Sequence, residues 1–299
     1  MQPTIKRAME PKDWLRLGIL SLVWGGSFFF VEVALRGFQP LTIVAIRVCI
    51  AAACLWIVVA ATHPGPLRGG MRPMRWMVMG AINNAAPFSL IVWSQTHVAS
   101  GHAAILNAAT PLFTVLVAHF ALRDEPLRLQ AIGGIMAGLI GVGLIVGTSG
   151  IGTSATVAAD LALVLAALSY ACASVYGRRF GKDPAIVTAA GQLTGASLIM
   201  IPLAMAFERP WLGDAPSVES LSAVVGLAVL STAFAYVVYF SILRRAGATN
   251  LMLVTLLVPA TALLLGVAVL GEGLAVPDLA GLAAIGLGLV VIDGRLIGK

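Results

Sequence analysis

Residues 107–147 read NAATPLFTVLVAHFALRDEPLRLQAIGGIMAGLIGVGLIVG, and residues 255–293 read TLLVPATALLLGVAVLGEGLAVPDLAGLAAIGLGLVVID. Landmarks recur in the same order in both: Pro111 and Pro259, then, with one residue of slippage, Glu125-Pro126-Leu127 and Glu272-Gly273-Leu274, Gly134 and Gly281, Gly141 and Gly288. Upstream of these, WGGSFFF (24–30) corresponds to YACASVY (170–176), and GFQPLTIV (37–44) to GKDPAIVT (181–188). The repeat period of about 146 residues predicts an internal duplication.

The composition places this duplication in a lipid bilayer. Apolar residues make up 59% of the 299, charged residues only 11%, and the mean hydropathy is +0.97. A soluble domain carries about 25% charged residues, so this chain cannot cover itself with polar surface. Its three cysteines lie in apolar runs and indicate no disulfide framework. The pI of 9.7 comes without a basic run or a nucleic-acid motif, so nucleic acid is not an expected partner.

Ten segments are long and apolar enough to span a bilayer, which takes roughly 20 residues each. We predict spanning helices at 15–36, 41–62, 74–96, 99–121, 128–147, 156–178, 185–207, 218–242, 248–271 and 276–296. The connecting segments are too short for a soluble domain. The first segment has no cleavage site after it, so we expect it to be a retained helix and not a signal peptide.

Lysine and arginine fix the expected orientation. With the N-terminus in the cytoplasm, sixteen basic residues fall on the inner side, only Arg36 and Arg209 fall outside, and Arg47 lies within the second segment. This asymmetry predicts that both termini are cytoplasmic.

Five segments per repeat is an odd number, so the second repeat enters the membrane from the opposite side. The charges agree, because four basic residues lie at the entry to the first segment and none occurs in GTSGIGTSATVAAD at the entry to the sixth. We therefore predict an all-α, 5+5 inverted-topology bundle of two repeats, 1–147 and 148–299. Such repeats are typical of alternating-access transporters with a midplane site; a duplicated packing scaffold is the alternative.

Trp24-Gly25 in the first segment, a proline in the fourth and ninth, and a glutamate soon after each of these complete an ordered set. The whole chain resembles the drug/metabolite transporter superfamily, EamA type, and within it the bacterial YddG-type exporters of aromatic amino acids. The resemblance implies secondary export of amino acids or related metabolites across the bacterial inner (plasma) membrane. It also implies a basket-like bundle with segments 1, 3, 4, 6, 8 and 9 around a central cavity. The related small multidrug transporters carry an acid midway along their first helix, which is missing here, so cation-drug exchange is disfavoured.

Acidic residues constrain both the chemistry and the cargo. Of thirteen, only Glu32 is predicted to lie within the membrane, and the rest are placed in loops or at helix ends. No hydrolase motif or acid pair is present, so we expect neither an enzyme, nor a cofactor, nor a metal. A strongly cationic substrate would need a midplane acid. A zwitterionic or neutral, partly apolar solute fits better.

Uncharged polar and aromatic residues gather at mid-depth, the composition of an apolar pocket with a few hydrogen-bonding groups. The predicted substrate-binding residues are Trp24, Phe28, Asn83, Asn84, Phe88, Asn107, Thr110, Tyr170, Thr232, Tyr236 and Thr255. Asn83 and Asn84 point about 100° apart on a helix, so one is expected to face the cavity and the other to bond a neighbouring helix. Pro87, Pro111 and Pro259 are the predicted hinges, with static kinks as the alternative.

Other residues have competing interpretations. Arg47 is expected either to snorkel to the outer interface, to pair with Glu32, or to bind a substrate carboxylate. His97, His102 and His119 are interpreted as interfacial residues, with pH sensing as the alternative. The glycines of the fifth and tenth segments predict close helix packing, within each repeat or at a dimer face.

The sequence thus predicts an exporter of aromatic or apolar amino acids or related small metabolites. The alternatives are a multidrug or nucleotide-sugar carrier of the same fold, or a passive channel. The exact substrate, the coupling ion and the oligomeric state, a monomer included, stay open.

Overall fold

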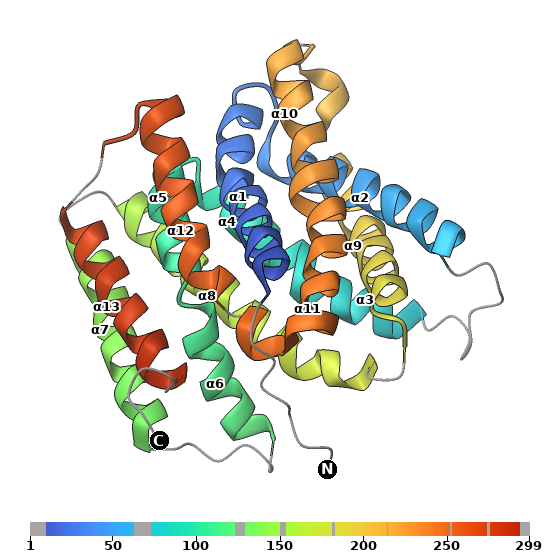
Figure 1. The fold of residues 1–299 in the computed structure, drawn as a ribbon. Helices are drawn as coiled ribbons and strands as arrows, with labels where there is room; N and C mark the ends of the chain where they lie inside the picture. Colours follow the sequence, from blue (N-terminus) through green and yellow to red (C-terminus); the bar gives the residue numbers. More distant parts are fainter. Residues whose placement is uncertain are drawn as a thin grey trace.

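The computed structural model describes residues 10–62, 73–122, 129–149, 154–180, 183–213, 215–251, 253–273 and 276–293, and the regular structure of these residues is helical throughout (Figure 1). The α-helices are α1 Pro11–Ala34, α2 Pro40–Thr62, α3 Pro73–Gly80, α4 Ala86–Ser94, α5 Ser100–Asn107, α6 Thr110–Ala121, α7 Leu129–Ser149, α8 Ser154–Gly177, α9 Ala185–Phe207, α10 Val218–Ala228, α11 Ala235–Leu251, α12 Val254–Leu265 and α13 Val276–Asp293. Three π-helical segments interrupt them, η1 Ala81–Ala85, η4 Val229–Phe234 and η5 Gly266–Leu270, and two short 3₁₀ turns are η2 Arg178–Phe180 and η3 Pro210–Leu212.

Seven helical segments within the described residues are long and apolar enough to cross a membrane. The other three predicted spans correspond to shorter apolar helices at Ile132–Val146, Val254–Leu270 and Val276–Ile292. A polytopic, all-helical membrane protein is therefore confirmed. The predicted alignment partner of Glu272, Glu125, lies outside the described residues, as do nine of the sixteen basic residues assigned to the inner side: Lys6, Arg7, Arg68, Arg72, Arg123, Arg128, Lys182, Arg295 and Lys299.

Two of the three predicted hinge prolines lie next to an interruption of the regular α-helix. Pro87 follows η1, and its missing N–H leaves the carbonyl four residues earlier, at Asn83, without its α-helical partner. Pro111 opens α6 after a break at Ala108 and Ala109, which separates α5 from α6. Pro259 lies inside the continuous helix α12.

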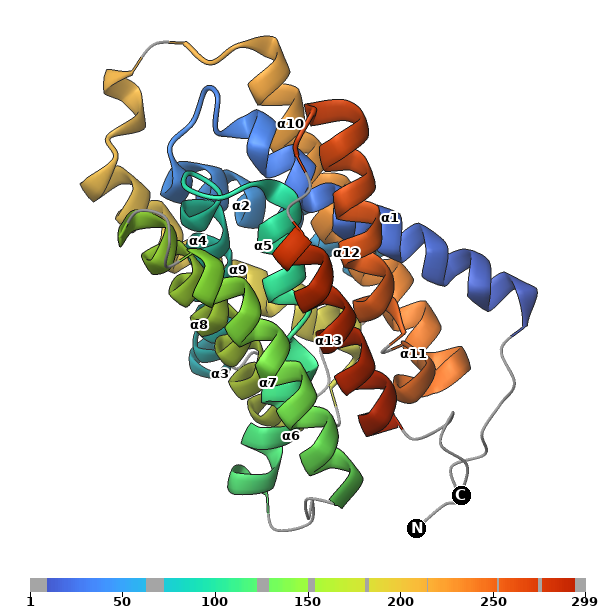
Figure 2. The same cartoon turned by 90° about the vertical axis from the view of Figure 1, so that its left-hand side faces the viewer.

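The helices before residue 150 pack mainly on helices after it, and the pairings are reciprocal. In Figure 1, α7 and α13 lie side by side at one edge of the molecule, and α2 and α9 lie together at the other. Helix α1 packs on α12, and α6 packs on α8. Helix α2 contacts η4, and α9 contacts η1. The second view shows the same α7–α13 pair from its outer side (Figure 2).

Glycines allow the α7–α13 pair to pack backbone against backbone. A Cβ added to Gly141 would lie 2.8 Å from the carbonyl oxygen of Gly281, and one added to Gly288 would lie 2.9 Å from the backbone nitrogen of Gly138. The glycines pack closely, as predicted, but they join the fifth predicted segment to the tenth and so lie between the two predicted repeats, not within each repeat.

Candidate functional site

A cluster of amides surrounds the hydroxyl of Tyr236 in the first turn of α11. Gln192 Nε2 lies 2.9 Å from this oxygen, Asn84 Nδ2 3.3 Å and Asn83 Nδ2 3.4 Å, and Asn83 Nδ2 is also 3.2 Å from Gln192 Oε1. A hydroxyl oxygen has two lone pairs, so the three amides share it. The ring of Tyr236 stacks on Phe240, with centroids 5.9 Å apart, which holds the hydroxyl in place.

Arg47 is a buried cation beside this cluster. Its Nε donates a 2.9 Å hydrogen bond to the hydroxyl of Thr232, and its guanidinium carbon lies 3.6 Å from the centroid of the Phe88 ring. The Thr232 hydroxyl in turn donates to the carbonyl of Leu227 at 2.9 Å, which leaves its oxygen free to accept from Arg47. No carboxylate of the described residues lies within ion-pair distance (4.0 Å) of Arg47. Arg47 is also only 7% exposed. Arg47 therefore neither snorkels outward nor pairs with Glu32.

Helix geometry places the arginine and the amides about one turn apart. Phe88, which lies against Arg47, is four residues beyond Asn84. Tyr236 is likewise four residues beyond Thr232. Four residues correspond to roughly one helical turn, about 5.4 Å along the axis. Both turns include a π-helical segment, where the backbone ladder is locally widened. The site therefore contains a cationic group and uncharged amides at neighbouring levels.

Two polar atoms of the π segments lack partners within the described part of the chain. The Oδ1 end of the Asn84 amide is buried without a hydrogen bond, although its Nδ2 end contacts Tyr236, and the hydroxyl of Ser231 is likewise unpartnered. Buried polar groups without partners cost free energy, so such atoms mark places for water or a ligand.

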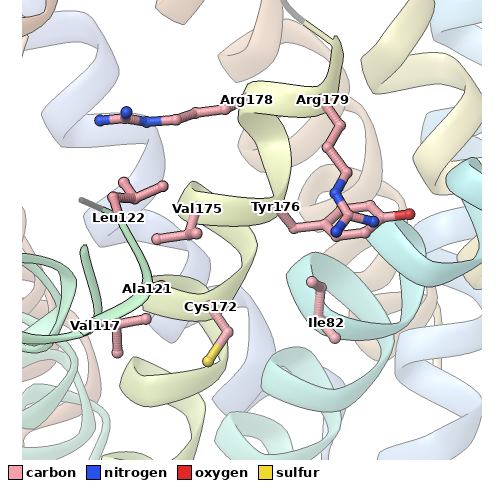
Figure 3. A pocket seen from close by; sticks show the side chains of 9 residues that line it. All are labelled: Ile82, Val117, Ala121, Leu122, Cys172, Val175, Tyr176, Arg178 and Arg179. Atoms are coloured by element: carbon pink, nitrogen blue, oxygen red, sulfur yellow. The ribbon is translucent and has the colours of Figure 1, made fainter. Parts of the chain in front are cut away.

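An open cavity of about 580 Å³ lies beside η1, between the ends of α6 and α8 (Figure 3). It is lined by Ile82, Val117, Ala121, Leu122, Cys172, Val175, Tyr176, Arg178 and Arg179. Ile82 immediately precedes Asn83, and its carbonyl accepts a 2.6 Å hydrogen bond from Ser169, next to Tyr170. The guanidinium of Arg179 lies over the Tyr176 ring, 4.7 Å from its centroid. The cavity is thus lined by two arginines, Arg178 and Arg179, and by Ile82, which directly precedes Asn83 of the amide cluster.

At the other end of the bundle, two carboxylates bridge early and late helices, and we interpret this end as the closed one. Glu208 accepts hydrogen bonds of 2.7 Å from the backbone nitrogens of Leu41 and Thr42 at the start of α2. Glu272 accepts from the backbone nitrogens of Ser100 and Gly101, at 2.9 and 3.1 Å, at the start of α5. Carboxylates at helix N-termini satisfy free N–H groups and complement the helix dipole.

The family comparison agrees with this architecture. The model of the EamA-like transporter family matches residues 14–147 and, a second time, residues 157–293. The chain belongs to the EamA-like transporter family. It is therefore a membrane transporter by family. Proteins of this kind are generally not enzymes, in line with the expectation from the acidic residues.

Several relatives of this EamA-like transporter match along most of their length. The uncharacterized transporter YoaV of Bacillus subtilis is 25% identical, covering 84% of this chain and 86% of its own. The protein PecM of Dickeya dadantii is 26% identical, covering 91% and 89%. The uncharacterized inner membrane transporter YedA of Escherichia coli is 25% identical, covering 91% and 88%. A crystal structure at 21% identity superposes with a TM-score of 0.69 over 97% of this chain and 99% of that one, which supports the fold alone.

The contacts of the EamA-like transporter bring together Asn83, Asn84, Phe88, Thr232 and Tyr236 from the predicted set, together with Arg47. Tyr170 packs against both apolar clusters of the bundle. The remaining five candidates lie on α1, α5, α6 and α12, and within the described residues none of them hydrogen-bonds to Tyr236 or Arg47. Trp24 packs on Tyr239, Phe28 is a buried core residue, Thr110 bonds the carbonyl of Asn107, and Thr255 is half-buried in the first turn of α12.

Three sequence interpretations need correction. Gln192 is absent from the predicted site residues, although it is a polar residue in an otherwise apolar run and is the eighth residue of α9, as Arg47 is the eighth residue of α2. Asp160, expected at a helix end, is the seventh residue of α8 and is fully buried, so Glu32 is not the only acid inside the bundle. His102, interpreted as an interfacial residue, contacts two aspartates.

Proposed function

We propose that this EamA-like protein is a bacterial inner-membrane exporter of amino acids with aromatic or apolar side chains, or of closely related metabolites, working by alternating access. Its architecture would be ten spans in two inverted repeats, 1–147 and 148–299, with both termini in the cytoplasm. The reciprocal pairings support the repeat, because α2 reaches η4 while α9 reaches η1. The closed carboxylate end and the open cavity at the opposite end are what alternating access requires.

Arg47 is the observation that carries the substrate class. A buried cation without a carboxylate partner is costly unless a ligand completes it, and an intramembrane charge is by default functional. Its Nη groups would bind a substrate carboxylate, with Phe88 below the guanidinium by cation–π contact. Asn84 Oδ1, about one turn away and without a partner, would accept from the ammonium. An aromatic or apolar side chain would contact Phe88, Tyr170 and Tyr236.

The decisive experiment is tryptophan counterflow in proteoliposomes, with analogues that separate the two charges. Tryptophan and indole-3-propionate carry a carboxylate, whereas tryptamine carries only the ammonium. We expect the carboxylates to compete and tryptamine to compete at least about tenfold more weakly, a difference of about 1.4 kcal/mol. Arg47→Gln should abolish this discrimination, and Arg36→Gln should not, because Arg36 lies in an exposed ion pair with Glu219.

Two outcomes would overturn the proposal. If folded wild-type protein moves no labelled tryptophan, the amino-acid assignment is wrong, and a multidrug or nucleotide-sugar cargo should be tested next. Uptake that rises linearly with concentration, without counterflow, would indicate a passive channel.

A further inference from the structure

A second polar cluster lies at the closed end of the bundle, away from the substrate site. His102 in the first turn of α5 contacts two aspartates, one through each ring nitrogen. Its Nε2 lies 2.7 Å from Asp160 Oδ1 in α8, and its Nδ1 lies 2.8 Å from Asp278 Oδ1 in α13. The side chains are nearly enclosed, with 12% of His102, none of Asp160 and 14% of Asp278 exposed.

The geometry fixes the number of protons in this cluster. Each hydrogen bond needs one hydrogen, so the two bonds need two. Either the imidazole is charged and donates from both nitrogens to two carboxylates, or it is neutral and accepts from one protonated aspartate while donating to the other. Both arrangements hold the same two protons. If one proton leaves, one of the two bonds becomes a contact between two acceptors and breaks.

One atom of the cluster indicates where one of the two protons lies. Asp160 Oδ2 is buried and has no hydrogen-bond partner within the described residues, in a side chain with no exposed surface. A buried oxygen without a donor costs more on a charged carboxylate than on a neutral carboxyl group, so this atom favours the arrangement in which Asp160 carries one of the two protons and donates it to His102. Direct contacts of 2.7 and 2.8 Å between the three side chains leave no room for a metal ion among them, and no metal-holding group of His, Cys, Asp or Glu occurs in the described part of the chain.

The cluster connects helices that come from different predicted repeats. Helix α5 belongs to the first, and α8 and α13 belong to the second. The other titratable groups near α5 are Glu272, which bonds its N-terminal nitrogens, Glu32 of α1, which lies near Glu272, and His97 in the preceding turn, which contacts Thr96. Among the described residues, only His102 contacts carboxylates of both α8 and α13. Its protonation therefore decides whether α5 is tied to both helices.

We propose that Asp160, His102 and Asp278 form a proton-binding site that holds this end of the transporter closed while it is protonated. Loss of a proton releases α5 from one of its two partners and favours opening at this end. The inference rests on the proposed alternating-access function, because opening at one end must then close the cavity at the other. It does not depend on which substrate is carried.

Cys172 offers a substrate-independent reporter, because it is exposed and lines the open cavity. With Cys49→Ala and Cys54→Ala as background, Cys172 is the single thiol. The rate of maleimide labelling would be measured in liposomes between about pH 5 and about pH 10, a range that extends to both sides of the one in which histidine side chains ordinarily titrate. Each rate would be divided by that of the denatured protein at the same pH, because thiolate reactivity itself rises with pH.

The variants should move this reporter in opposite directions. In the unsubstituted cluster, we expect the normalised rate to fall at least threefold as the pH rises. His102→Gln loses the double bridge, so labelling should be slow at all pH values. Asp160→Asn places an amide that donates to a neutral imidazole, so both bonds persist without the second proton and labelling should stay fast at all pH values.

Glu208→Gln serves as the control, because it weakens a different contact of the same end and should keep the pH dependence. The proposal is overturned if the unsubstituted cluster shows no pH dependence, or if the His102 and Asp160 variants retain it. A chain that fails to move tryptophan but shows the expected labelling pattern would refute the amino-acid substrate and leave the proton site supported.

Discussion

Arg47 in α2 donates to Thr232 in η4 at 2.9 Å, across 185 positions of the chain. Gln192, the eighth residue of α9, forms a similar contact with the other π-helical segment, because its Oε1 accepts from Asn83 in η1 at 3.2 Å. Each of these helices therefore places a polar side chain against the π-helical segment of the other repeat. The first contact is made by a charged guanidinium and the second by an uncharged amide. The positive charge therefore lies on the side of the polar cluster formed by α2 and η4.

Thr232→Val tests the first of these contacts. It preserves the shape of the side chain but removes the acceptor of Arg47, leaving a buried donor unpaired. We expect the protein to lose about 1–3 kcal/mol of stability, seen as a lower Tm in detergent. Thr232→Ser keeps the hydroxyl and should lie close to wild type. Equal Tm values for the valine variant and wild type would show that Arg47 finds another partner.

Tyr236→Phe removes the oxygen that Asn83, Asn84 and Gln192 share. Because these amides are buried or half-buried, we expect a loss of roughly 1–3 kcal/mol in unfolding free energy and weaker substrate binding. Tyr176→Phe is the matched control: the Tyr176 hydroxyl has no hydrogen-bond partner in the described part of the protein, so the change should stay within about 0.5 kcal/mol. If the two variants behave alike, the amide cluster contributes little.

Two glycines of α7 should respond oppositely to alanine. A Cβ at Gly141 meets the Gly281 carbonyl oxygen at 2.8 Å and the Ile285 nitrogen at 3.0 Å, so Gly141→Ala should cost about 1–3 kcal/mol. A Cβ at Gly143 meets nothing within 4 Å, so Gly143→Ala should be neutral or gain up to about 1 kcal/mol from helix propensity. Thermal unfolding of both variants checks the α7–α13 packing. An unaffected Gly141 variant would contradict it.

Substitutions of Glu208 and Glu219 compare a half-buried carboxylate contact with an exposed one. Glu208 accepts from two backbone nitrogens and from the Thr42 hydroxyl, each at 2.7 Å, so Glu208→Gln should cost about 1–3 kcal/mol. Glu219 pairs with Arg36 while both side chains are more than half exposed, so Glu219→Gln should change stability by at most about 1 kcal/mol. Chemical denaturation in detergent would rank them. The reverse order would mean that the α2 terminus is solvated.

Alkylation of Cys172 should block transport, because a maleimide adduct would fill part of the cavity beside η1. We expect N-ethylmaleimide to inhibit wild-type counterflow strongly and to leave Cys172→Ala largely active. Cys49 and Cys54, both half-buried in α2, remain in that variant and provide an internal control. Continued inhibition of Cys172→Ala would place the sensitive thiol in α2.

Part of the candidate site could be predicted from sequence. Asn83, Asn84 and Tyr236 stand out as polar groups in apolar segments, and bonding among neighbouring helices was an expected outcome for one of the two asparagines. Pro87 beside η1 and Pro111 at the α5–α6 break follow from the missing proline N–H. Pro259 does not interrupt helix α12, because a helix in a bundle can accommodate the loss of one backbone hydrogen bond locally.

The partners of the ionisable groups could not be predicted in this way. The sequence allows three interpretations of Arg47, because the depth of a residue in a helix says nothing about which helix faces it. Asp160 and Asp278 were placed at helix ends, and His102 at an interface, since each alone looks like an ordinary boundary residue. Their assembly into one cluster depends on the arrangement of α5, α8 and α13.

The sequence by itself determined that the chain is a helical membrane protein, where its apolar segments lie, and that it contains a repeat. Those properties depend on the composition of continuous segments, because both the transfer of a segment to lipid and the asymmetry of positive charge follow from the residues within and beside it. Only the tertiary structure decided that Arg47 meets Thr232 and Phe88, that Gln192 joins the amides, and that His102 bridges Asp160 and Asp278. These contacts join residues 41 to 185 positions apart in the chain, and side-chain packing between helices selects them.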